Sequence, residues 1–148
     1  MLVYRIVLER YATLFASGVE GRWNSAGAKV LYTAASRALA CLENVVHRSG
    51  EGLNENFKTL VIDLPSTERI EKISVKDLPM DWQLYNKEHI CRLIGDDWYY
   101  RQESLILQVP SVIIPDEVNY IINVQHKNFK KVKLKSIDPF IFDSRIKR

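Results

Sequence analysis

The sequence lacks the motifs of several large enzyme classes. It contains no GxGxxG, GxxxxGK[ST], HExxH or GxSxG segment and no pair of CxxC motifs. These absences argue against doubly wound dinucleotide-binding folds, P-loop enzymes, zincins and α/β-hydrolases. The three histidines, at positions 47, 89 and 126, are too widely spaced for a metal site to be proposed from the sequence.

Cysteine is scarce, and long apolar runs are absent. Cys41 and Cys91 have neither a metal-ligand spacing nor a CxxC spacing, so we expect idle thiols in a reducing compartment. No apolar run reaches the roughly 18 residues that cross a bilayer. Arg5, Glu9 and Arg10 would interrupt any N-terminal signal segment. These features predict a cytoplasmic protein that does not enter a membrane.

The composition is that of one globular domain. The chain has 148 residues, of which 47% are hydrophobic and 26% charged, and a domain of this size buries roughly 68 to 70 per cent of its unfolded surface. The net charge of +3 is uneven: residues 126–148 hold eight Lys or Arg and two Asp, giving +6, so the remainder is 13 − 16 = −3. This basic end fits the solvated face of edge strands, or a surface for phosphates or an acidic partner.

Segments rich in β-branched and aromatic residues predict strands. They are residues 2–8, 28–34, 58–65, 69–75 and 118–123, two pieces bent at Pro110 within 104–115, and a final pair within 130–143. A turn around Pro65 and Ser66 joins two of these strands, and residues 8–21 predict a short helix or a loop. Neither an internal repeat nor a linker is found, so we expect one α+β domain over residues 1–148.

The hydrophobic period changes from strand to helix at Ala35, and Gly50 offers a stop for this helix. Its apolar side is predicted to consist of Leu39, Leu42, Val45 and Val46. A second stripe beside it contains Ser36, Ala40, Glu43 and His47. Residues 84–102 predict another helical segment, with a break at Gly95.

The segment EGRWNSAGAKVLYTAASRALACLE, residues 20–43, holds the candidate site residues. Arg22 stands in a loop, where its guanidinium could bind a phosphate or, more commonly, form a structural salt bridge. Tyr32 in a strand would ordinarily be core. Glu43 lies among small and apolar residues, either exposed at the margin or partly buried to stabilise positive charge. His47, one turn later, either pairs with Glu43 or lies free on the surface.

Taken together, these residues resemble the RES-domain family, the toxin half of a bacterial toxin–antitoxin pair. The resemblance rests on YRI near the start, on GRWNSAGAKVLYTAASRALACLENVVH and on LILQVPSVIIPDEVNYIINVQH, which span Tyr4 to His126. The Arg, Glu and Ser that give the family its name fall on Arg22, Glu43 and Ser111.

The resemblance implies a fold like that of ADP-ribosyltransferases, with mixed or antiparallel sheets and flanking helices. It implies that NAD is consumed as a substrate, without a cofactor, which arrests growth. The implied partner is a Xre-type antitoxin that occludes the active site, in an assembly that could include a toxin homodimer, without direct binding to nucleic acid. The implied catalytic residues are Glu43, Arg22 and Tyr32, and the implied substrate contacts are Arg22, Tyr32, Ser111, Trp23, Asn24 and Ser36.

Cleavage of the nicotinamide–ribose bond places oxocarbenium-like charge on the sugar, and Glu43 would stabilise that charge. Arg22 would bind the pyrophosphate, Tyr32 would supply an aromatic wall or a hydroxyl anchor, and Ser111 would position the substrate. The ADP-ribose could pass to water, to phosphate or to a protein side chain. A different class of function is a non-catalytic module that binds an acidic partner or nucleic acid through the basic end.

Overall fold

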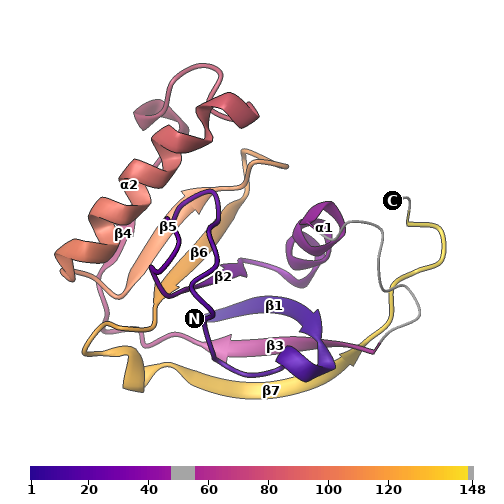
Figure 1. Ribbon diagram of the computed structural model, residues 1–148. Coiled ribbons are helices and arrows are strands. Elements are labelled where there is room, and N and C mark those ends of the chain that lie inside the picture. Colours follow the sequence, from indigo (N-terminus) through magenta and orange to yellow (C-terminus); the bar gives the residue numbers. More distant parts are fainter. Residues whose placement is uncertain (48–55, 147–148) are drawn as a thin grey trace.

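Seven strands form one mixed sheet in the computed structural model, which describes residues 1–47 and 56–146 (Figure 1). The strands are β1 (Leu2–Leu8), β2 (Val30–Ala34), β3 (Phe57–Asp63), β4 (Ile70–Lys72), β5 (Ile106–Pro110), β6 (Val118–Asn123) and β7 (Lys133–Phe140). Their order across the sheet is β4-β5-β6-β2-β1-β3-β7. The β4–β5 pair is parallel, and the other neighbours are antiparallel.

Two α-helices and four short 3-10 helices complete the described part of the chain. They are α1 (Arg37–His47), α2 (Glu88–Arg101), η1 (Glu9–Tyr11), η2 (Val75–Asp77), η3 (Tyr85–Lys87) and η4 (Phe129–Lys131). Within residues 1–47 and 56–146, no helix is both long enough and apolar enough to cross a membrane.

The sheet is nearly divided between β1 and β2. These two strands share a single registered pair, Tyr4 with Ala34, whereas β1 pairs with β3 over seven positions, from Leu2 to Leu8. Figure 1 shows β1 and β2 diverging from this junction. The Arg5 guanidinium bridges the divergence, because its Nη1 donates to the Tyr32 carbonyl at 2.9 Å. Burial lowers the pKa of Arg5.

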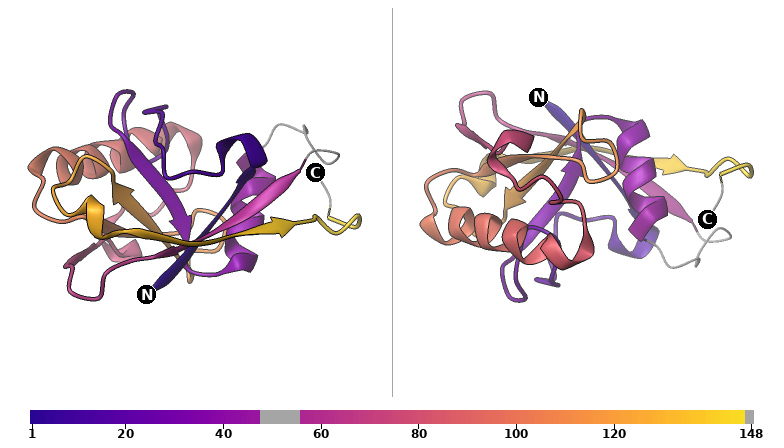
Figure 2. Two further views of the ribbon diagram at one scale, coloured as in Figure 1. Left: turned by 90° about the horizontal axis from the view of Figure 1, so that it is seen from below. Right: turned by 90° about the horizontal axis from the view of Figure 1, so that it is seen from above.

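Both α-helices cover the same face of the sheet, as the view from above in Figure 2 shows. Helix α1 packs Leu39 and Ala40 against Ile6 of β1, while α2 belongs to a second cluster with Leu107 and Ile121. Strand residues alternate between faces, so the opposite face has its own core. That core contains Val3, Leu31, Leu60, Ile62, Ile106 and Ile122.

The structure confirms the α+β class, and β1 and β6 have the predicted bounds. Helix α1 also forms, but its predicted apolar side is partly wrong. Leu42 and Val46 are exposed, and the buried positions are Leu39 and Ala40. The helix packs Leu39, Ala40 and, in part, Cys41 and Val45 against the cluster that contains Ile6 of β1, which leaves Leu42 and Val46 on its outer side. The predicted stop at Gly50 lies outside the described residues.

The predicted break at Gly95 is wrong, because α2 runs through that residue to Arg101. A Cβ atom at position 95 would lie 1.7 Å from the Trp23 carbonyl oxygen. Glycine therefore serves here for the close approach of a loop to the helix.

Two of the predicted strand pieces do not form. Residues 112–114 are not a strand; they belong to a turn in which the Ser111 hydroxyl accepts from the backbone N–H groups of Ile113 and Ile114. The predicted final pair is the single strand β7. Strands β3 and β4 both form, but the turn between them leads β4 to the far edge of the sheet, beside β5.

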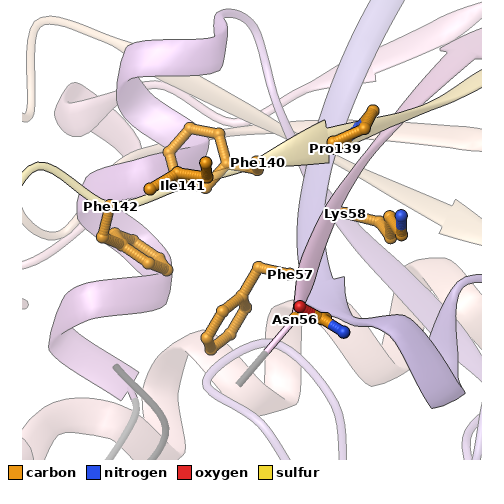
Figure 3. Close-up of a pocket in the computed structure, with 7 residues that line it drawn as sticks. All are labelled: Asn56, Phe57, Lys58, Pro139, Phe140, Ile141 and Phe142. Carbon is orange, nitrogen blue, oxygen red and sulfur yellow. The ribbon is translucent and has the colours of Figure 1, made fainter. Parts of the chain in front are cut away.

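A pocket of about 190 Å³ opens at the ends of β3 and β7 (Figure 3). It is lined by Asn56, Phe57, Lys58, Pro139, Phe140, Ile141 and Phe142. The rings of Phe57 and Phe142 pack edge to face, with their centroids 4.9 Å apart. None of the predicted site residues lines this pocket, so it is separate from the site that the sequence predicts.

Candidate active site

Glu43 is positioned by the first turn of α1. The Ser36 hydroxyl accepts a hydrogen bond of 3.1 Å from the Leu39 N–H, as a residue that caps a helix N-terminus does. Two turns later the Glu43 side chain is only 21% exposed. In this structure Ser36 fixes the start of the helix, and its predicted contact with a substrate stays a prediction.

The Glu43 carboxylate accepts hydrogen bonds from three different parts of the chain. Oε1 accepts from Ser111 Oγ at 2.9 Å and from Asn119 Nδ2 at 2.8 Å, and Oε2 lies 3.3 Å from His47 Nε2. Burial acts to raise the pKa of Glu43, but the three donors outweigh it, and the pKa lies below its ordinary value. The carboxylate is therefore partly buried and charged at neutral pH.

Ser111 faces Glu43 and has no exposed surface. Its hydroxyl donates to the carboxylate and accepts from two backbone N–H groups of the following turn. Its predicted contact with a substrate stays a prediction. In this structure the hydroxyl orients Glu43.

His47 pairs with Glu43, and the charge of Arg22 acts on its imidazole. The hydrogen bond to Glu43 raises the pKa of His47, and burial and the positive charge of Arg22 act in the opposite direction. The His47 side chain is 76% exposed and lies at the outer end of the pair. Because the charge of Arg22 acts on His47, the guanidinium lies within electrostatic range of the Glu43–His47 pair. The pairing alternative for His47 is thus confirmed.

Arg22 is held by a segment between η2 and η3. Its Nη1 donates to the Trp82 carbonyl at 3.0 Å and its Nη2 to the Gln83 carbonyl at 3.3 Å. The guanidinium carbon also lies 5.9 Å from the centroid of the Trp82 ring. Within residues 1–47 and 56–146, no carboxylate pairs with Arg22 at ion-pair distance. The structural salt bridge is therefore not formed there, and the charge of Arg22 is not neutralised by a carboxylate.

Tyr32 is fixed by the loop that carries Arg22. Its hydroxyl donates to Asn24 Oδ1 at 2.5 Å and accepts from the Trp23 N–H at 3.0 Å. Burial raises the pKa of Tyr32. Trp23 and Asn24 are themselves buried, and the Asn24 amide donates to the carbonyls of Val19 and Ala28. These two residues hold Tyr32 in place, and their direct contact with a substrate stays a prediction.

Helix α2 anchors the same loop through residues that sequence reasoning missed. Asp96 Oδ1 accepts from the Ser25 N–H at 2.8 Å, and Oδ2 accepts from the Ser25 hydroxyl. Next to it, Gly95 lets the Trp23 carbonyl approach the helix. Asn119 was also missed. The available signal was an amide at the second position of a mostly apolar strand, VNYIIN.

The arrangement combines two opposite charges with different surroundings. Glu43 is a charged carboxylate held by neutral donors and one exposed histidine, whereas Arg22 is held by carbonyl oxygens. A fixed carboxylate stabilises positive charge that develops nearby, and a guanidinium without a carboxylate partner binds phosphate. The site is therefore suited to a substrate that is anionic at one group and becomes cationic at another.

Comparisons with known proteins identify close relatives. The family model described as RES domain matches residues 2–143. A protein named "Prs ADP-ribosylating toxin" from Sphingobium sp. (strain YBL2) is 36% identical over 130 residues, covering 86% of this chain and 81% of the relative. "Toxin Res" from Yersinia enterocolitica is 35% identical over 154 residues, covering 99% of this chain and 100% of the relative.

A solved structure shares the fold. It is the MbcT–MbcA toxin-antitoxin complex of M. tuberculosis, with a TM-score of 0.77 and 15% sequence identity. The match covers 95% of this chain and 84% of the matched chain. At this identity the likeness supports the architecture alone.

Proposed function

This chain belongs to the RES domain family, and on that premise we propose that it is the enzymatic toxin of a toxin–antitoxin pair and cleaves the nicotinamide–ribose bond of NAD. The observation that carries the proposal is the Glu43 carboxylate, which is 21% exposed and whose Oε1 accepts from Ser111 and Asn119. A carboxylate held in this way is ready before the substrate arrives.

The charge of Glu43 matches the demand of the reaction. As the bond to nicotinamide breaks, a neutral leaving group departs and the ribose carbon becomes positively charged. A carboxylate fixed beside that carbon stabilises the cation more than the ground state, which lowers the barrier. Oε2 is the oxygen that meets the sugar, because its partner His47 is exposed and can turn away.

Arg22 binds the negatively charged pyrophosphate of NAD. The carbonyls of Trp82 and Gln83 fix the direction of its guanidinium, so little side-chain freedom is lost when an anion binds. The hydroxyl of Tyr32 is occupied by Trp23 and Asn24, so Tyr32 acts through its ring, as a wall of the nucleotide site.

The acceptor of the ADP-ribose is water or phosphate in this proposal. A protein side chain is the second candidate, and the name of the Sphingobium relative, "Prs ADP-ribosylating toxin", favours it. The described residues offer one well-held carboxylate at the site, which stabilises the sugar cation whichever acceptor attacks.

The proposed partner is a Xre-type antitoxin that covers the Arg22 and Glu43 side chains. Two relatives are named as Res toxins with nearly full coverage of the chain, and the structural neighbour is a toxin-antitoxin complex; both observations support a protein antitoxin. We place this assembly, with a toxin homodimer, in the cytoplasm, where NAD is available.

One incubation tests the proposal. Purified protein is mixed with NAD, with and without phosphate, and with a cell extract as a source of protein acceptors. Nicotinamide, free ADP-ribose, phosphorylated ADP-ribose and modified protein are then separated and measured. We expect nicotinamide release together with free or phosphorylated ADP-ribose. Nicotinamide release only with modified protein would select the second candidate, and no release in any mixture would refute both.

A further inference from the structure

Asn119 contacts the Glu43 carboxylate from the sheet. It lies on β6, where its register partner on β2 is Ala34. Its Nδ2 donates to Glu43 Oε1 at 2.8 Å, and its Oδ1 is buried without a hydrogen-bond partner in the part of the chain that the structure describes. The same carboxylate oxygen accepts from Ser111.

An amide at this position is costly for the fold. The neighbouring positions on β6, Tyr120, Ile121 and Ile122, are buried hydrophobic residues. A buried carbonyl oxygen without a partner costs free energy that an apolar side chain of similar size would avoid. The amide therefore has a purpose other than stability. Among residues 1–47 and 56–146, the hydrogen bond of its side chain is with Glu43.

From this geometry we infer that Asn119 is a positioning residue for the proposed NAD cleavage. Together with Ser111 it holds Oε1, so that the carboxylate cannot rotate and Oε2 is directed toward the sugar cation. This inference rests on the proposed function for its catalytic consequence, but the contact itself can be tested without turnover.

The test compares Asn119→Ala and Asn119→Asp with the wild type. Loss of a hydrogen bond to a charged group corresponds to a roughly ten- to hundredfold change, so we expect kcat for NAD to fall by about that factor in Asn119→Ala. KM should change less than about threefold, because the contact acts mainly as charge develops. The acid limb of the kcat profile should move to higher pH, and further in Asn119→Asp, where two carboxylates meet.

Asn44 provides a matched control. It is the residue after Glu43 on α1, and its Nδ2 donates to the Ile6 carbonyl at 3.0 Å. Its Oδ1 is also buried, without a partner among residues 1–47 and 56–146. Asn44→Ala therefore removes the same chemical group from the fold without touching the carboxylate. We expect a similar loss of thermal stability, with the acid limb unmoved and kcat close to wild type.

Two results would overturn the inference. One is an unmoved acid limb in both Asn119 variants; the other is an equal fall of kcat in Asn119→Ala and Asn44→Ala. If the wild type releases no nicotinamide, the proposed function fails separately. The positioning role of Asn119 is then tested by NMR titration of the Glu43 carboxyl carbon, which measures the pKa of Glu43. A higher Glu43 pKa in Asn119→Ala but not in Asn44→Ala supports the positioning role, and an unchanged pKa refutes it.

Discussion

The Ser111 hydroxyl lies 2.9 Å from Glu43 Oε1, although 68 positions separate the two residues in the chain. The contact joins the turn after β5 to the second turn of α1. Ser111 is completely buried, and its hydroxyl also accepts hydrogen bonds from the backbone N–H groups of Ile113 and Ile114. One hydroxyl thus links the shape of a turn to the orientation of the carboxylate.

Ser111→Ala should reduce both stability and activity. The substitution removes one donor to Glu43 and leaves two backbone N–H groups without their acceptor, so we expect a loss of about 1 to 3 kcal/mol in the free energy of unfolding. The rate of nicotinamide release should fall about tenfold or more. Urea unfolding and a steady-state assay measure the two effects.

Ser104→Ala is the matched control for that variant. Ser104 is also buried, and its hydroxyl accepts from the Trp98 indole N–H at 3.0 Å, away from Glu43. It should lose stability without a comparable loss of rate. Equal rates of nicotinamide release for the two alanine variants would show that Ser111 has no special relation to the site.

The His47–Glu43 pair should contribute a pH-dependent part of the stability. The pKa of His47 is raised above 6.5 in the folded protein, so its contribution is fully present below that pH and is lost as the pH rises through the folded-state pKa. The pKa of Glu43 is lowered, so its own contribution disappears only in acid. Because His47 is largely exposed, the effect should be small, about 0.5 kcal/mol.

Urea unfolding of wild type and His47→Ala over a range of pH measures this effect. The difference between the two proteins should be largest in mildly acidic solution and shrink as the pH rises through the raised folded-state pKa of His47. A difference that grows toward alkaline pH would mean that the pair does not form in solution.

Gly95→Ala should disturb the loop that carries Arg22. The new Cβ would lie 1.7 Å from the Trp23 carbonyl oxygen, which is backbone and cannot turn away. We expect a loss of about 1 to 3 kcal/mol in the free energy of unfolding. We also expect a raised KM for NAD, because a shift of Trp23 displaces Arg22, the residue before it in the chain. Leu93→Ala, at an exposed position on the same helix, should change neither. Unfolding curves measure the loss of stability, and Michaelis–Menten kinetics measure KM. A wild-type KM for Gly95→Ala would contradict the view that Gly95 anchors the loop that carries Arg22.

Much of the fold could be predicted from local patterns. The β-branched runs predicted all seven strands, with two further pieces that do not form, and the helical spacing after Ala35 predicted α1, since these signals depend on neighbours in the chain. Leu42 and Val46 show the limit. Which side of α1 is buried depends on how the helix lies on β1, and no local pattern contains that information.

The site could be predicted only in part, for a related reason. Arg22, Tyr32 and Glu43 could be selected from their local setting and Ser111 from the resemblance, but the roles of Ser111 and Asn119 depend on pairings between distant segments. Asn119 reaches Glu43 because β6 pairs with β2 and places it opposite Ala34. Gly95 was read as a helix break because its partner, the Trp23 carbonyl, lies 72 positions earlier in the chain.

The most direct test of the central claim is the rate of nicotinamide release from NAD by Glu43→Gln beside the wild type. Glutamine keeps the shape of the side chain, and its oxygen can still accept from Ser111 and Asn119, while the negative charge is lost. An electrostatic contact to the transition state is worth about 3 to 4 kcal/mol, so the rate should fall by roughly two to three orders of magnitude with the fold intact. A folded Glu43→Gln protein that releases nicotinamide as fast as the wild type would contradict the account.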